Sequence, residues 1–163
     1  MEVPNGVRCG LGIDFHGGRR AALLKTLQSG VLVMKGLESP RKLSRFTQDK
    51  SFWYLTGVSA PGAWLVQAVD GEPILFLPKP NPYKESWDGE LWDTGDAWAP
   101  YVTGIQDVRG IHELEATLKE LRKEHEPFWT SMHPAVSLTD SYDTAGPYDQ
   151  PAARAPWDGA PSR

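Results

Sequence analysis

Cysteine is nearly absent from this sequence, with Cys9 the single one among 163 residues. A lone cysteine cannot form a disulfide within the chain, and that agrees with a reducing compartment. No apolar run approaches the roughly 20 residues that a membrane-spanning helix needs. The first residues also lack the apolar core of a signal peptide. We therefore expect a cytoplasmic location and no membrane partner.

Clustered positive charge is also missing. The formal net charge is −4, and the densest basic stretches, "RKLSR" and "KELRK", are short. A protein that binds the phosphate backbone needs clustered Lys and Arg, so we expect no nucleic-acid partner. The length and the hydrophobic content of 40% are those of one ordinary globular domain.

No complete catalytic motif is present. His112 and Glu113 begin like a zinc-binding H-E-x-x-H helix, but position 116 is Ala, so we interpret both as helix N-terminal residues. "GLGIDF" lacks the spacing of a dinucleotide-binding loop, and neither a P-loop nor G-x-S-x-G occurs. Asp88, Asp93 and Asp96 suit a cation site or a stand-alone hydrolase. Solvated loop carboxylates are the favoured interpretation, because no base or nucleophile accompanies them.

Hydrophobic periodicity and turn residues indicate an α/β order of elements. Two helices are predicted, one over 17–30 with Gly30 just past its end and one over 110–126 with an apolar stripe at Ile111, Leu114, Leu118 and Leu121. Strands are predicted over 31–36, 51–55, 61–69, 72–78, 105–110 and 127–132, with a tight turn at 70–71 and short helical turns within 79–98.

Alternation within the central hairpin predicts two sheet faces. Ala63, Leu65 and Gln67 would face one way, and Trp64, Val66 and Ala68 the other. The fold class is therefore α/β, a mixed sheet flanked by helices with an antiparallel central hairpin. We divide the chain into a loose leader over 1–16, a domain over 17–133, and a Pro-rich linker or arm over 134–163.

One ordered set of motifs resembles a known family. An Arg-Arg helix precedes "FTQDKSFWYLTG", then a hairpin ending in "LFLP", then "ESWDG". In this order and spacing, residues 19–133 resemble the N-terminal domain of aminopeptidase P and its creatinase and prolidase relatives. The resemblance implies a small α/β domain with a mixed sheet and a ribonuclease-H-like layer, in which the aromatic run "FWYL" forms a strand.

The resemblance also implies a larger metallopeptidase domain after this one. In the family, that domain binds two divalent metals, usually manganese, through two Asp, one His and two Glu. The metals activate water to attack the bond before a proline. None of these ligands can be placed in this sequence, so no cofactor is expected in this chain. The Pro-rich segment lies where the interdomain connection would be.

The resemblance assigns a role to the Glu-x-Trp-x-Gly segment. Trp87, with Glu85, would border the substrate entrance of a neighbouring subunit in the oligomer; the alternative for Trp87 is core packing. Two departures weaken the cross-subunit contact that the resemblance implies. Thr47 replaces a frequent Arg, and the basic pair at 41–42 replaces an acidic residue. The other aromatic residues are interpreted as sheet core: Phe52, Trp53, Tyr54 and Trp64.

Two functions from different classes follow. The first is the non-catalytic N-terminal domain of an Xaa-Pro aminopeptidase, inactive alone. It would serve a homo-oligomer that cleaves proline-containing peptides, with the catalytic domain in the same chain or a nicked one. The alternative is a stand-alone binding or oligomerisation module without catalysis. In that case the Trp-rich segment 87–98 would be its docking surface.

Overall fold

The computed structural model describes residues 11–38, 46–88 and 91–131. These residues form a five-stranded sheet in the order β4-β3-β2-β1-β5. The three central strands are antiparallel, while β4 and β5 are each parallel to their neighbour. This arrangement confirms the predicted mixed sheet. The strands are β1 (Val31–Lys35), β2 (Trp64–Ala68), β3 (Ile74–Leu77), β4 (Asp107–Gly110) and β5 (Phe128–Trp129).

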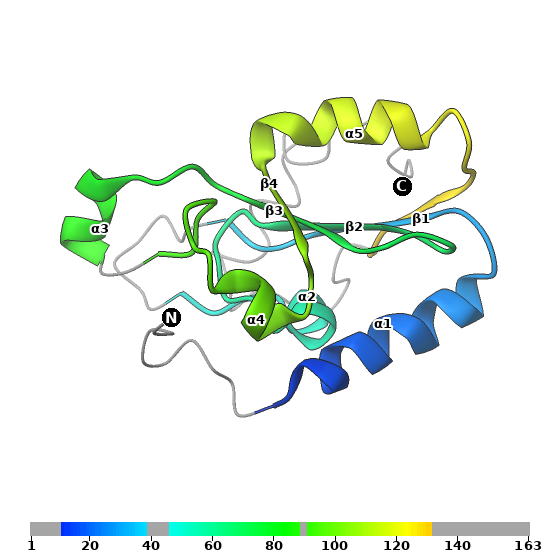
Figure 1. Ribbon diagram of the computed structural model, residues 1–163, viewed down its shortest axis with the longest axis horizontal. Coiled ribbons are helices and arrows are strands. Elements are labelled where there is room, and N and C mark those ends of the chain that lie inside the picture. Colours follow the sequence, from blue (N-terminus) through cyan, green and yellow to red (C-terminus); the bar gives the residue numbers. More distant parts are fainter. Residues whose placement is uncertain (1–10, 39–45, 89–90, 132–163) are drawn as a thin grey trace, which may run out of the picture.

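Helices cover both faces of the sheet (Figure 1). One face packs on η1 (Ile111–Glu113) and α5 (Leu114–Leu121). The other face packs on α1 (Ile13–Leu27), α2 (Lys50–Thr56) and α4 (Ala99–Thr103). A further short helix, α3 (Pro82–Asp88), lies at one end of the molecule (Figure 1). In the described part of the chain, no helix is both long enough and apolar enough to cross a bilayer.

The predicted alternation along the central hairpin is confirmed. Ala63 and Leu65 pack in the cluster beneath α1 and α2, whereas Trp64 and Val66 pack in the cluster beneath α5. The predicted stripe of the last helix is confirmed as well, because Leu114 and Leu118 lie in that second cluster and Ile111 and Leu121 pack against it. Each face of the sheet thus buries its own set of side chains, as the strand period of two requires.

The structure corrects both ends of α1. The helix begins at Ile13, inside the segment predicted to be a loose leader, and His16 is buried. It ends at Leu27, with Gln28 as its cap at a positive φ of 68°, two residues before Gly30, which has a positive φ of 94°. Glycine is also required there by space, because a Cβ at Gly30 would lie 2.0 Å from the carbonyl oxygen of Pro127. The close approach of the segment before β5 therefore requires glycine.

The aromatic run "SFWYL" is helical, so the prediction of a strand is wrong. Asp49 begins α2 by accepting a 2.8 Å hydrogen bond from the backbone N–H of Phe52. Gly57 ends it in the left-handed region, with φ 74°, and donates to the carbonyl of Trp53 at 2.7 Å. The run has the composition of a strand, but the cap residues at both ends specify a helix.

Burial within α2 follows the helical period. Phe52 is fully buried and Leu55 nearly so, whereas Tyr54 is exposed. Of the four aromatic residues assigned to sheet core, Phe52 and Trp64 are buried, Trp53 is half-buried and Tyr54 is exposed. The core assignment is therefore correct for Phe52 and Trp64, with Phe52 buried from a helix that lies on the sheet.

Candidate functional site

Trp87 lies on the outer surface of α3 and is 76% exposed. The interpretation of Trp87 as core is therefore wrong. Tyr83, four residues earlier on the same helix, is 77% exposed. Residues at i and i+4 lie on one helix face, so α3 presents two neighbouring aromatic rings to solvent. We call Tyr83 and Trp87 the α3 aromatic pair.

Glu85, the other predicted site residue, has a structural role. Its Oε1 accepts a hydrogen bond from the backbone N–H of Leu91 at 3.2 Å, which ties the chain that follows α3 back onto the helix. At the start of α3, Asn81 Oδ1 accepts from the backbone N–H of Lys84 at 3.1 Å. These two bonds hold the short helix in place. Glu85 therefore supports the helix, whereas the ring of Trp87 is exposed to solvent.

The remaining tryptophans of the Trp-rich segment are buried. Trp92 and Trp98 are 7% and 8% exposed, and their rings meet edge to face with centroids 4.5 Å apart. They belong to the cluster beneath α1, α2 and α4. Of the three tryptophans in the predicted docking surface 87–98, Trp87 is the one exposed to solvent.

Two of the three candidate carboxylates bind the backbone of their own turn. Asp93 is buried and accepts from the N–H of Gly95 at 2.6 Å, while Asp96 accepts from the N–H of Asp93 at 2.8 Å. The side chain of Asp88 lies outside the described residues. In the described ranges, no group of three or more His, Cys, Asp or Glu could hold a metal. Asp93 and Asp96 are thus used within their own turn, and the described residues offer no site for two metals.

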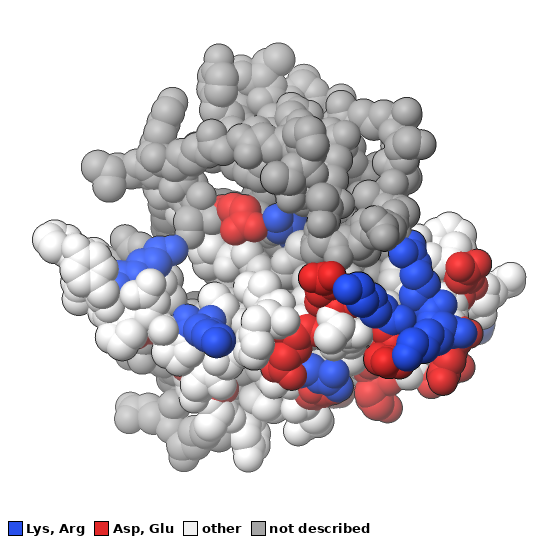
Figure 2. Space-filling view, turned by 90° about the horizontal axis from the view of Figure 1, so that it is seen from above, with Lys and Arg blue, Asp and Glu red and all other residues white. Residues whose placement is uncertain are grey.

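The start of the last helix agrees with the interpretation of His112 and Glu113. Glu113 Oε1 accepts a hydrogen bond from the backbone N–H of Gly110 at 3.1 Å, which satisfies a donor at the helix start. Along α5, Glu115 and Lys119 form an ion pair at 2.7 Å, as do Glu120 and Lys123. Figure 2 shows acidic and basic side chains intermingled over this part of the surface.

Sequence reasoning missed the importance of the buried Gln48. Its Oε1 accepts from the N–H of Leu37 at 2.7 Å and from that of Asp49 at 2.8 Å. Its Nε2 donates to the carbonyl of Ala60 at 2.8 Å. One amide thus joins the end of β1, the start of α2 and the segment before β2. The Gln-Asp pair of the family motif could have indicated this role, because both Gln48 and Asp49 hold the start of α2.

The side chains of Arg19 and Arg20, the two arginines of α1, make different contacts. Arg19 lies over the rings of Phe15 and Tyr54, at 5.0 and 5.2 Å from their centroids. Arg20 is 5% exposed, and its Nη1 donates to the carbonyl of Leu55 at 2.7 Å. Burial lowers the pKa of Arg20, because the charged form loses solvation. Arg20 thereby fastens the end of α2 to α1.

His16 makes a second buried contact between the same helices. It is 1% exposed, and its Nδ1 lies 3.0 Å from the carbonyl oxygen of Tyr54. Because a carbonyl only accepts, Nδ1 is the donor in this contact. The predicted Arg-Arg helix therefore packs its neighbour through side chains that bind backbone carbonyls.

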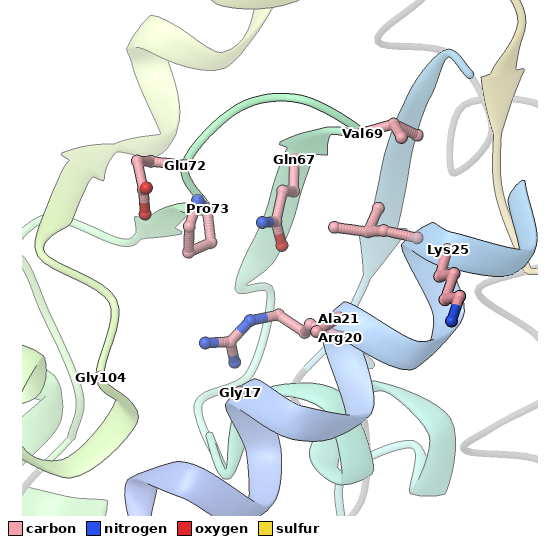
Figure 3. Close-up of a pocket in the computed structure, with 10 residues that line it drawn as sticks. Gly17, Arg20, Ala21, Lys25, Gln67, Val69, Glu72, Pro73 and Gly104 are labelled. Carbon is pink, nitrogen blue, oxygen red and sulfur yellow. The ribbon is translucent and has the colours of Figure 1, made fainter. Parts of the chain in front are cut away.

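Next to Arg20, a polar pocket of about 500 Å³ lies between α1 and the turn that joins β2 to β3. Arg20 and Gln67 line it from opposite sides, and Lys25 and Glu72 also contribute (Figure 3). Sequence reasoning did not assign any function to these four residues. Arg20 and Gln67 are distant in the sequence, and only the packing of α1 against β2 brings them to one pocket.

Comparison with known proteins identifies the class of this domain. Residues 16–129 match the family model described as the N-terminal domain of aminopeptidase P. The chain belongs to this family, and the resemblance found in the sequence is confirmed.

Among curated proteins, the chain is 36% identical over 91 residues to Xaa-Pro aminopeptidase 3 of Rattus norvegicus, covering 52% of this chain and 18% of that protein. It is 30% identical over 114 residues to the Xaa-Pro aminopeptidase of Haemophilus influenzae, covering 64% and 26%.

Solved structures agree on the fold. Zn-substituted Escherichia coli aminopeptidase P in complex with product superposes with a TM-score of 0.63 at 22% identity, over 82% of this chain and 31% of that one. Pseudomonas aeruginosa aminopeptidase PepP gives a TM-score of 0.62 at 20% identity, over 82% and 31%. The chain therefore spans less than a third of the length of these relatives.

Proposed function

We propose that this chain is the non-catalytic N-terminal domain of an Xaa-Pro aminopeptidase. The family match over residues 16–129 supports this function and carries the proposal. The relatives named above are Xaa-Pro aminopeptidases that extend well beyond the matched segment. In this proposal, a metallopeptidase catalytic domain in the same chain or a nicked one cleaves the bond before proline, in the cytoplasm.

The two divalent metals, manganese in this proposal, belong to that catalytic domain. When bound there, they would supply a hydroxide nucleophile and polarise the substrate carbonyl. The described residues of the present chain supply no ligand group for them. The contribution of this chain is therefore the shape of the substrate entrance and the contact between subunits.

The α3 aromatic pair is the proposed contact surface of this chain. Aromatic side chains are enriched at protein interfaces, where a few of them provide much of the binding energy. Trp87 and Tyr83 expose about three quarters of their surface, and the local hydrogen bonds of Asn81 and Glu85 fix their helix. We propose that Trp87 borders the active-site entrance of a neighbouring subunit, with Glu85 positioning the helix that bears it.

The test replaces Trp87 in the full protein as its source cell makes it. Trp87→Ala is compared with Tyr101→Ala, because Tyr101 is 71% exposed on α4 and so matches the loss of an exposed ring. Light scattering gives the oligomeric mass, and kcat/KM is measured on peptides with proline in the second position. We expect Trp87→Ala to lower kcat/KM or subunit affinity about tenfold or more. Tyr101→Ala should behave like the wild type.

Equal behaviour of the two variants would contradict the proposed role of Trp87. If the native protein forms an oligomer but does not cleave proline peptides, the alternative function replaces the first. The chain would then be a binding or oligomerisation module without catalysis.

A further inference from the structure

The pocket between α1 and the β2–β3 turn contains a buried cation that forms no ion pair with any described residue. The Arg20 guanidinium is 5% exposed and has one hydrogen-bond acceptor, the carbonyl of Leu55. None of the ion pairs between described residues includes Arg20. A buried charge is costly unless it is paired, and a guanidinium has five N–H donors to satisfy. The rest of this donor set borders the pocket (Figure 3).

The same pocket contains a buried acceptor that receives no hydrogen bond from the described residues. Gln67 is 9% exposed, and its Nε2 donates to the carbonyl of Gly71 at 3.0 Å. That bond fixes which amide atom is nitrogen. The Oε1 is buried and has no hydrogen-bond partner among the described residues. Figure 3 shows the Gln67 amide and the Arg20 guanidinium directed into one space from β2 and α1. A ligand that satisfies both groups needs an anionic oxygen and an N–H or O–H donor.

Two exposed charges lie at the rim of this pocket, Glu72 and Lys25. Neither forms an ion pair with another described residue. In Figure 3 the amine of Lys25 points away from the space between Arg20 and Gln67, whereas Glu72 lies on the opposite side of that space. A carboxylate at the rim favours a ligand that also has a positive charge.

We propose that this pocket binds a free amino acid or a dipeptide. The ligand carboxylate pairs with Arg20, an N–H of the ligand donates to Gln67 Oε1, and the ammonium lies toward Glu72. The volume of about 500 Å³ falls within the range of ligand sites, about 300–1,000 Å³, and admits a dipeptide. Inorganic phosphate would satisfy Arg20 but would be repelled by Glu72. A metal cation would be repelled by Arg20. The proposal rests on this chain alone and is independent of the proposed function.

The experiment is a titration of the full 163-residue chain followed by the backbone amide signals in NMR. The probes are L-leucine and glycyl-L-leucine. Two comparison compounds each change one feature: leucinamide lacks the carboxylate, and N-acetyl-leucine lacks the ammonium. Inorganic phosphate, which has neither group, is the control for a simple anion. We expect saturable shifts at Gly17, Gly71 and Gly104 with the two probes. Leucinamide should bind at least about tenfold more weakly, because it loses the charge-assisted hydrogen bonds to Arg20. Phosphate should also bind at least about tenfold more weakly, because it lacks the ammonium and is repelled by Glu72.

Three variants locate the contacts. Arg20→Lys should weaken leucine binding about tenfold or more, because an ammonium cannot form the paired hydrogen bonds of a guanidinium. Glu72→Gln should weaken leucine binding and leave N-acetyl-leucine unaffected. Because Glu72 is exposed, this variant tests the proposal even where Arg20→Lys does not fold. Lys25→Gln is the matched control for loss of a rim charge and should change leucine binding less than twofold or so.

Several outcomes would overturn the proposal. One is the absence of saturable shifts in the wild type with either probe up to about 10 mM. Another is leucinamide or phosphate binding as tightly as leucine, since the pocket would then not recognise an amino-acid carboxylate. A third is an equal change in leucine binding in Glu72→Gln and Lys25→Gln. Glu72 would then not contact the ligand ammonium specifically, and either rim charge would act only through the general electrostatic field.

Discussion

Replacing Gly57 by alanine tests the helical end of the aromatic run. Gly57 has φ 74°, and its N–H donates to the carbonyl of Trp53 at 2.7 Å. A Cβ at this position would lie 2.9 Å from Nε2 and 3.0 Å from Cδ2 of His16. His16 cannot easily move, because it is 1% exposed and its ring packs edge to face on Phe15 and Trp53.

Two effects lower the free energy of unfolding in this variant. The left-handed conformation costs alanine roughly 1–2 kcal/mol. Forcing a methyl group against a packed ring costs about 1–3 kcal/mol. Gly57→Ala should therefore lower the free energy of unfolding by about 2–5 kcal/mol, a large part of the about 5–15 kcal/mol of a typical domain.

Urea unfolding followed by tryptophan fluorescence measures this loss, with the slope m unchanged. Gly18→Ala is the matched control. Gly18 lies within α1, and a Cβ there would have nothing within 4 Å. It should raise the free energy of unfolding by about 0.5–1 kcal/mol, because alanine loses less conformational entropy in a helix. A Gly57→Ala variant as stable as the wild type would refute the assignment of Gly57 as the end of α2 against His16.

The remaining predictions concern a buried amide and a surface ion pair. Gln48→Leu removes three hydrogen bonds, two of them buried and one partly buried, and should cost about 3 kcal/mol in the same assay; a loss below about 1 kcal/mol would contradict the role given to this amide. Lys119 lowers the pKa of Glu115, so this pair stabilises the fold fully above the ordinary carboxyl pKa and less as the pH falls through the lowered value. Glu115→Gln should therefore be less stable than the wild type at neutral pH and equally stable in acid. A deficit that is constant across pH would contradict this.

The sequence predicted those elements whose periodicity and burial agree. Leu114 and Leu118 recur at helical spacing, and α5 buries that stripe. Trp64 and Leu65 alternate, and each sheet face receives one of them. In both cases one local pattern settles both the type of element and the direction of its side chains.

The type of the aromatic element was predicted wrongly because its composition favours a strand and its cap residues favour a helix. Phe, Trp and Tyr in a row favour a strand by propensity, but Asp49 and Gly57 delimit a helix of seven residues. A short segment is governed by its ends, and its aromatic side chains pack from a helix as well as from a strand. The caps were visible in the sequence and were outweighed by propensity.

The candidate sites depended on information that no local pattern contains. The motif resemblance pointed to Trp87, but its exposure became known only from the packing around α3. Arg20 and Gln67 meet at one pocket through the packing of α1 against β2. Contacts between segments so far apart in sequence leave no periodic signal. A single Arg or Gln in a sequence also does not show whether its hydrogen-bonding groups find partners in the fold.

The most direct test of the central proposal is the activity and mass of the native protein. The protein is isolated from its source cell through an antibody to this domain, assayed on a peptide with proline in second position, and weighed intact. We predict proline-dependent cleavage that chelators abolish, in a polypeptide or complex larger than the 18.1 kDa of this chain. A single species of 18.1 kDa that does not cleave the peptide would contradict the proposed function.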